Sequence, residues 1–175
     1  MIDKFIFNQK DKTVFKELEK KYKTHRKGYV ILGPMAIGKT YWLDRQELKN
    51  EKVDWLDQDE YLVNIGAINW DVWKNPKPNS INYKLQYMRA DYGTTMAKAL
   101  GYRLIGSNFL DLIPDAIVFV PEELHKKFMS TRNKSKKFRE NIERVKKNLK
   151  LIASKHKVPV FESVEDAVNF LEKKK

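Results

Sequence analysis

A glycine-rich segment at residues 33–40, with the sequence GPMAIGKT, constrains the fold more than any other part of the chain. It fits the pattern G-x-x-x-x-G-K-[ST] at every fixed position. An apolar run at residues 29–32 precedes it, and a helix is expected from about Lys39 to Lys49. A strand, a glycine loop and a helix in this order form a P-loop, whose backbone N–H groups surround phosphate. The segment therefore predicts that the chain binds a nucleoside triphosphate.

The residue types in this loop fit ATP and Mg²⁺ as cofactors. The Lys39 ammonium can reach the β- and γ-phosphates, and the Thr40 hydroxyl is placed to ligate Mg²⁺. A strand-to-helix turn with an accidental lysine is the alternative, and the strand and helix on either side of the loop disfavour it. The expected nucleotide-binding residues are Gly33, Met35, Ala36, Ile37, Gly38, Lys39, Thr40 and Tyr41.

Short apolar runs alternate with helical patterns along the rest of the chain. Strands are expected at 29–32, 53–56, 103–105, 116–120 and 158–161. Helices are expected at about 12–25, 39–49, 85–100 and 135–156, and after Ser163 as N-cap. Residues 61–82 show no clear period and are expected to be irregular. This alternation predicts one α/β domain with a parallel sheet and helices on its faces.

The composition limits the class of protein. The chain has 175 residues, 42% hydrophobic and 33% charged, which fits one compact domain. No apolar run approaches the roughly 20 residues that span a bilayer, so no membrane partner is expected. The absence of cysteine excludes disulfides and thiol chemistry and indicates a reducing cytoplasm. The oligomeric state stays open, a homodimer included.

The net charge of +12 favours a polyanionic partner, either a nucleotide or a nucleic acid. The lysines are spread along the whole chain rather than gathered in one tract. A surface on which lysine is simply the default residue explains them equally well.

Three acidic residues, Asp57, Asp59 and Glu60, follow the second expected strand. Ligands of an open parallel sheet bind beyond the carboxyl ends of its strands, and residues two apart on extended chain point the same way. We therefore expect Asp57 and Asp59 to face the P-loop and the substrate. Asp59 could act as a general base or hold Mg²⁺ through water, and Asp57 is a candidate metal ligand. The alternative is a solvated turn that caps the next helix.

The other expected strands distinguish a kinase from a motor or a switch. Motor ATPases and GTPases place an aspartate at the end of a second apolar strand. Here Gly106 and Ser107 follow one candidate strand, and Pro121 follows the other. The segment NKSK at residues 133–136 also lacks the aspartate of a guanine-recognition motif. These absences favour a kinase.

Arginines and aromatic residues are candidates for contacts with substrate. Arg132 and Arg139, with Arg144, lie between the fourth and fifth expected strands, and we expect one of them to contact the transferring phosphate. Arg89, before the third strand, is a candidate for binding substrate. Aromatic residues of the same region could stack on a base or simply pack in the core: Trp70 and Tyr87 above all, with Trp73, Tyr83 and Tyr92.

With these residues, the chain from about residue 28 to 171 resembles the small P-loop kinases, the nucleoside monophosphate kinase and polynucleotide kinase group. The resemblance implies a P-loop NTPase fold in three layers, with five parallel strands in the order 2-3-1-4-5. It also implies one kinase domain over residues 1–175, with an acceptor-binding insertion at about 61–99 and an arginine-bearing lid at about 129–144.

Two features of the chain imply different acceptors. The segment LDQDEY at residues 56–61 is similar to the second-strand end of 5′-hydroxyl polynucleotide kinases, which implies Asp59 as the base. The small size, the tryptophan-rich segment and the terminal helix resemble a phage-type deoxynucleoside monophosphate kinase. A hydroxyl acceptor needs a base, whereas nearby carboxylates repel a phosphate acceptor.

Three functions are therefore open. The leading one is an ATP-dependent kinase of a (deoxy)nucleoside monophosphate, in deoxynucleotide metabolism. The second is a kinase of a hydroxyl on nucleic acid, either a polynucleotide 5′-hydroxyl or a modified base. The third is a non-catalytic nucleic-acid-binding protein that keeps a relic P-loop.

Overall fold

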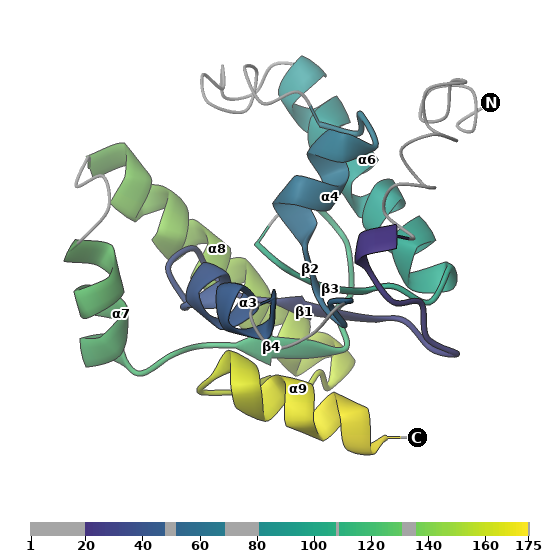
Figure 1. Ribbon diagram of the computed structural model, residues 1–175. Helices are drawn as coiled ribbons and strands as arrows, with labels where there is room; N and C mark the ends of the chain where they lie inside the picture. The colour runs from purple at the N-terminus through teal and green to yellow at the C-terminus, as the bar shows by residue number, and fades with distance from the viewer. Residues whose placement is uncertain (1–19, 48–51, 69–80, 108, 131–135, 175) are drawn as a thin grey trace.

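A central sheet of five parallel strands organises the computed structural model, which describes residues 20–47, 52–68, 81–107, 109–130 and 136–174 (Figure 1). The strands are β1 (Tyr29–Leu32), β2 (Leu56–Asp57), β3 (Arg103–Gly106), β4 (Ala116–Val118) and β5 (Val160–Phe161). Their order across the sheet is β2-β3-β1-β4-β5, and every neighbouring pair is parallel. This five-stranded parallel sheet and its strand order are those that the resemblance to the small P-loop kinases implies.

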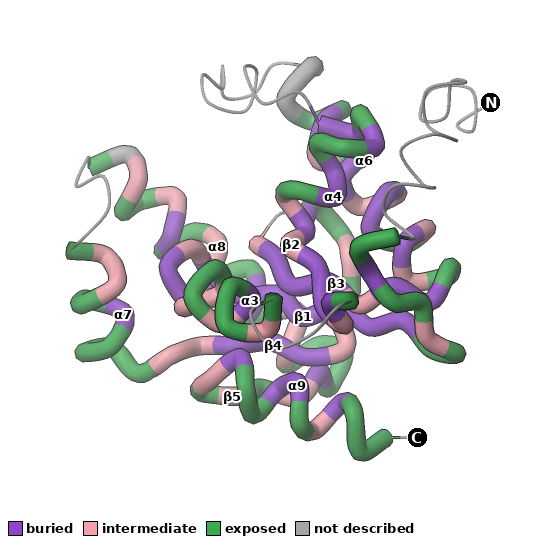
Figure 2. The backbone as a smooth tube through the Cα atoms, in the orientation of Figure 1, coloured by how far each residue is buried: buried purple, intermediate pink, exposed green. Residues whose placement is uncertain are grey.

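Helices cover both faces of the sheet (Figure 1). They are α3 (Lys39–Glu47), α4 (Gln58–Asn64), α6 (Ile81–Ala99), α7 (Glu122–Ser130), α8 (Lys136–His156) and α9 (Val164–Lys173). The apolar core of one face includes residues of α4, α6 and α8, and that of the other includes residues of α3 and α9. In Figure 2 the buried residues accordingly gather around the strands, while the outer surfaces of the helices are exposed.

The β1 strand is buried on both faces of the sheet, which explains its unbroken apolar sequence. Successive side chains of a strand point to opposite faces. Val30 and Leu32 belong to the core that packs against α6 and α8, and Tyr29 and Ile31 to the core that packs against α9. The strand that leads into the P-loop is therefore held from both sides.

The elements around the second strand differ from the prediction. The strand is β2, Leu56–Asp57, and Val53 forms only an isolated parallel bridge with Tyr22. This bridge requires extended chain at Tyr22, so the helical stretch that includes Lys20 ends at Lys21 and the expected helix to His25 is wrong at that end. Residues 12–19 of the expected helix lie outside the described residues.

Two helices were missed from the sequence. Residues 58–64 form α4, whereas an irregular segment was expected from residue 61. The α6 helix was expected, but it begins at Ile81 rather than at residue 85. The α7 helix was not expected, although Pro121 before it and Glu122 and Glu123 in its first turn are ordinary signals of a helix start. The expected lid at 129–144 combines the end of α7, the start of α8 and a stretch outside the described residues.

The C-terminal third follows the prediction closely. Ser163 is the N-cap of α9, and its hydroxyl oxygen accepts a hydrogen bond of 3.0 Å from the Asp166 backbone N–H. The Asp166 carboxylate accepts a hydrogen bond from the Ser163 hydroxyl rather than from the Ser163 backbone. The buried residues of α9 are Val164, Ala167, Val168 and Leu171. Among the helices of the described ranges, none has the length and apolar character to cross a membrane.

The β3 strand approaches α4 so closely that its last residue must be glycine. A Cβ on Gly106 would lie 2.5 Å from the Cβ and from the Cδ of Gln58, the first residue of α4. Gln58 is fully buried, and its side-chain Nε2 donates a hydrogen bond of 2.9 Å to the Thr94 hydroxyl on α6. Contact with β3 and a hydrogen bond to α6 therefore fix the start of α4.

We expect Gly106→Ala to lower the free energy of unfolding by about 1–3 kcal/mol, because the added methyl group overpacks this contact. Urea unfolding followed by circular dichroism measures the change. Ser154→Ala, on the exposed side of α8, is the control, with an expected change within about 0.5 kcal/mol. Equal stability of the Gly106→Ala protein and the wild type would contradict the tight contact.

Candidate active site

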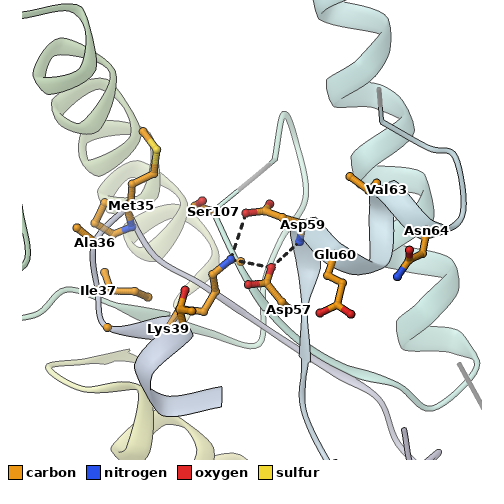
Figure 3. A pocket seen from close by; sticks show the side chains of 14 residues that line it. Met35, Ala36, Ile37, Lys39, Asp57, Asp59, Glu60, Val63, Asn64 and Ser107 are labelled. Atoms are coloured by element: carbon orange, nitrogen blue, oxygen red, sulfur yellow. Dashed lines mark hydrogen bonds and ion pairs between the residues drawn. The ribbon is translucent and has the colours of Figure 1, made fainter. Parts of the chain in front are cut away.

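A cleft of about 570 Å³ lies at the carboxyl ends of the strands, between the P-loop and α4 (Figure 3). The P-loop, residues 34–40, forms one wall of this cleft. The rest of the lining comes from the end of β2, from α4 and from the end of β3: Asp57, Asp59, Glu60, Val63, Asn64, Gly106 and Ser107. The topology thus brings the two predicted acidic residues, Asp57 and Asp59, to the P-loop.

The conformation of the P-loop depends on its two glycines. Gly38 has a φ of 83°, in the left-handed region that favours glycine. A Cβ on Gly33 would lie 2.8 Å from the Val118 carbonyl oxygen, so only glycine fits beside β4. Ala36 also has a positive φ of 66°, which residues with a side chain seldom adopt. The loop is held by its surroundings in a shape suited to binding an anion.

The Lys39 ammonium lies between the two acidic residues of the cleft. Its Nζ is 2.8 Å from Asp57 Oδ1 and 3.1 Å from Asp59 Oδ2, and its side chain is 15% exposed. Burial acts to lower the pKa of Lys39, but the charges of Asp59 and Asp57 outweigh burial and raise this pKa above its ordinary value. The P-loop lysine therefore carries its charge at neutral pH and faces the acidic end of β2.

Asp57 serves two structural purposes at once. It is the N-cap of α4, and its Oδ1 accepts a hydrogen bond of 2.8 Å from the Asp59 backbone N–H. The same Oδ1 accepts the hydrogen bond from Lys39. The sequence left two alternatives for Asp57, a cap of the next helix and a residue that faces the cleft. In the structure Asp57 has both roles.

The wall of the cleft opposite the P-loop is acidic. Lys39 is the single cation among the described lining residues, which also include the carboxylates of Asp57, Asp59 and Glu60. Glu60 is bonded away from the cleft centre, to the Lys21 ammonium at 3.4 Å and to the Tyr22 hydroxyl at 3.3 Å. Asp57 and Asp59 are therefore the carboxylates that interact with Lys39.

The residues present suit a nucleotide with a magnesium ion. Magnesium prefers oxygen ligands and usually takes one or two from the protein and others from phosphate and water. Thr40 and Asp57 line the same cleft and offer such oxygens. No group of three or more acidic or histidine residues that could hold a metal ion occurs within the described part of the chain. A magnesium ion bound through Thr40 and Asp57 would take its remaining ligands from phosphate and water.

Other predicted site residues lie away from this lining. Arg139 is exposed on α8, Arg89 and Tyr87 are half-buried on α6, and Tyr41 is 65% exposed with Arg45 over its ring. None of these four residues is part of the described cleft lining. Arg132 and Trp70 lie outside the described residues. The roles of all six residues stay predictions.

The sequence interpretation missed several residues of the cleft wall. Val63 and Asn64 line it because α4 extends along the cleft, and the irregular segment expected there hid them. Ser107 follows β3 directly, and its place after a buried strand was an available signal.

Comparisons with known proteins identify no family for the chain. No protein-family model and no curated protein sequence matches it. Among solved structures, it is similar to a chain described under the PezAT chromosomal toxin–antitoxin system of Streptococcus pneumoniae, at 14% sequence identity and a TM-score of 0.38. The match covers 71% of this chain and 62% of that one. So distant a likeness carries no argument about the reaction.

We expect the double substitution Asp57→Asn and Asp59→Asn to lower the pKa of Lys39. Burial remains in this variant, while the two charges that raise the pKa are lost. Asparagine at residue 57 can still cap α4, so the fold should be retained. Nuclear magnetic resonance of the lysine Cε and Hε signals measures the titration. Glu60→Gln is the matched control and should leave the Lys39 titration unchanged, and an unchanged titration in the double variant would contradict the ion pairs.

Proposed function

We propose that the chain is an ATP- and Mg²⁺-dependent kinase that transfers the γ-phosphoryl group to a hydroxyl group. One observation carries this proposal: the cleft wall opposite the P-loop presents Asp57 and Asp59 to Lys39. A hydroxyl acceptor must lose a proton during transfer, and a carboxylate beside the transferring phosphate can take it. A phosphate acceptor would instead meet two negative charges.

In the proposed reaction, the P-loop N–H groups and Lys39 bind the phosphates of ATP and offset their charge. Asp59 accepts the proton of the acceptor hydroxyl as its oxygen forms a bond with the γ-phosphorus. The bond between that phosphorus and the bridging oxygen of ADP breaks, and ADP leaves with its electron pair. Magnesium, held by Thr40 and Asp57, would supply further charge neutralisation at the phosphates.

The local contacts support Asp59 rather than Asp57 as the base. Asp57 Oδ1 is committed to the α4 cap and to Lys39, both at 2.8 Å. Asp59 also bonds Lys39, at the longer distance of 3.1 Å, and it lies in the first turn of α4. Asp57 is therefore assigned to holding the helix and the metal, and Asp59 to the proton.

Transfer to a (deoxy)nucleoside monophosphate was the leading hypothesis from the sequence, and it becomes the second candidate. It needs cations on the acceptor side, and Arg89 on α6 is the residue that could supply one. The Arg89 Nε is buried and has no hydrogen-bond partner within the described residues. The net charge of +12 favours a nucleic acid as the molecule that bears the acceptor hydroxyl group. The third candidate, a non-catalytic nucleic-acid-binding protein with a relic P-loop, does not explain why two carboxylates pair with Lys39.

The test is a transfer assay with γ-labelled ATP and Mg²⁺. A 5′-hydroxyl oligonucleotide and the deoxynucleoside monophosphates are offered in separate reactions. Label on the oligonucleotide supports the proposal, and label in a diphosphate supports the second candidate instead. We expect Lys39→Met to abolish transfer and to weaken ATP binding measured by calorimetry. A protein that labels neither acceptor, and that binds ATP no more tightly than its Lys39→Met variant, is not a kinase.

We expect Asp59→Asn to lower kcat on a hydroxyl acceptor by about 10²- to 10⁴-fold, because the proton acceptor is lost. ATP affinity should not fall, since the change removes a negative charge near the phosphates. Glu60→Gln is the matched control next to Asp59 and should keep most of the activity. Equal losses of kcat on hydroxyl and phosphate acceptors would indicate that Asp59 serves the metal rather than the proton.

A further inference from the structure

A buried histidine outside the cleft lining contacts the P-loop backbone. His125 on α7 is 5% exposed, and its Nε2 lies 2.9 Å from the Met35 carbonyl oxygen. The contact joins residues 90 positions apart in the sequence. In Figure 1 the P-loop lies between α7 on one side and α4 on the other. His125 therefore contacts the loop from α7, whereas Asp57 and Asp59 contact Lys39 from the end of β2 and the start of α4.

The direction of this hydrogen bond fixes one peptide of the loop. A carbonyl oxygen can only accept, so the His125 Nε2 must carry the proton that it donates. The described chain contains no cis peptide bond. In a trans peptide the C=O and N–H groups point in opposite directions. With the Met35 carbonyl directed toward His125 on α7, the Ala36 N–H is directed the opposite way, and both residues line the cleft.

The loop needs such a restraint at this position. Ala36 has a φ of 66°, a conformation that residues with a side chain seldom adopt, so the free chain would favour another orientation of the peptide. The α7 helix is also close to the loop at Gly38, because a Cβ built on Gly38 would be 3.3 Å from the Phe128 ring. The α7 helix thus lies against the loop at Met35 and close to it at Gly38.

We propose that His125 is a positioning residue for the P-loop, whose hydrogen bond to Met35 holds the Ala36 N–H ready to donate to a phosphate oxygen of ATP. This inference rests on the proposed nucleotide binding and adds to it the residue that preorganises the loop. His125 itself touches neither nucleotide nor acceptor. Its loss should weaken binding of the triphosphate without changing the reaction of bound ATP.

The test compares His125→Leu, which removes the donor, with His125→Gln, whose side-chain amide can donate at similar reach. We expect His125→Leu to weaken binding of Mg²⁺–ATP and of Mg²⁺–tripolyphosphate about tenfold, measured by calorimetry. The KM for ATP should rise by the same factor and kcat should stay within about twofold. His125→Gln should recover most of the affinity. Lys126→Ala, its exposed neighbour on α7, is the control and should bind like the wild type.

A measurement on the wild type covers the case in which the leucine variant does not fold. The ¹⁵N signals of the His125 ring must report a protonated Nε2, and the Ala36 amide proton must shift when tripolyphosphate is added. The positioning role would be overturned by an Nδ1–H tautomer of His125 or by an Ala36 amide signal that does not shift. It would also be overturned if His125→Leu bound ATP as tightly as the wild type, or if His125→Leu and His125→Gln bound ATP equally weakly. Wild-type protein that binds no ATP would overturn the proposed function instead, so the two failures are distinguishable.

Discussion

The ion pairs of Lys39 with Asp57 and Asp59 are the interaction on which the site depends. They join the first turn of α3 to the end of β2 and the start of α4, so one ammonium group links the two walls of the cleft. Burial alone would disfavour this charge, and the paired carboxylates reverse that effect. The wall opposite the P-loop is thereby kept within hydrogen-bond distance of the P-loop lysine.

Close packing behind the cleft sets the position of that opposite wall. Gly106 lets β3 approach Gln58, and the buried amide of Gln58 bonds Thr94 on α6. Asp57 then caps α4 with the same carboxylate oxygen that accepts the hydrogen bond from Lys39. The packing of β3 against Gln58, the cap of α4 and the ion pair with Lys39 therefore act together. They explain why the acidic segment that follows β2 has a defined conformation.

The P-loop, the apolar strands and the approach of Asp57 and Asp59 to Lys39 could be predicted because they depend on local patterns. The P-loop sequence, the apolar strands and the rule that ligands bind at the carboxyl ends of strands place Lys39 near Asp57 and Asp59. The missed parts depend on contacts between distant segments. A pattern search has no reason to pair Tyr22 with Val53 or His125 with Met35, and both contacts join residues far apart in the chain. Short helices such as α4 are also set by their caps and packing more than by periodicity.

The bridge between Tyr22 and Val53 has a consequence for the edge of the sheet. Among the described strands, β2 is the outermost on its side, so its outer N–H and C=O groups are not paired within the sheet. Its length of only two residues limits what such an edge offers to a strand of another molecule. Just before β2, the segment that carries Tyr22 is bonded on both sides of the bridge, from the Lys23 N–H to the Val53 carbonyl at 3.0 Å and from the Val53 N–H to the Lys21 carbonyl at 3.1 Å. The chain thus uses its own backbone to pair the residues that lead into β2, which shortens the exposed edge of the sheet further.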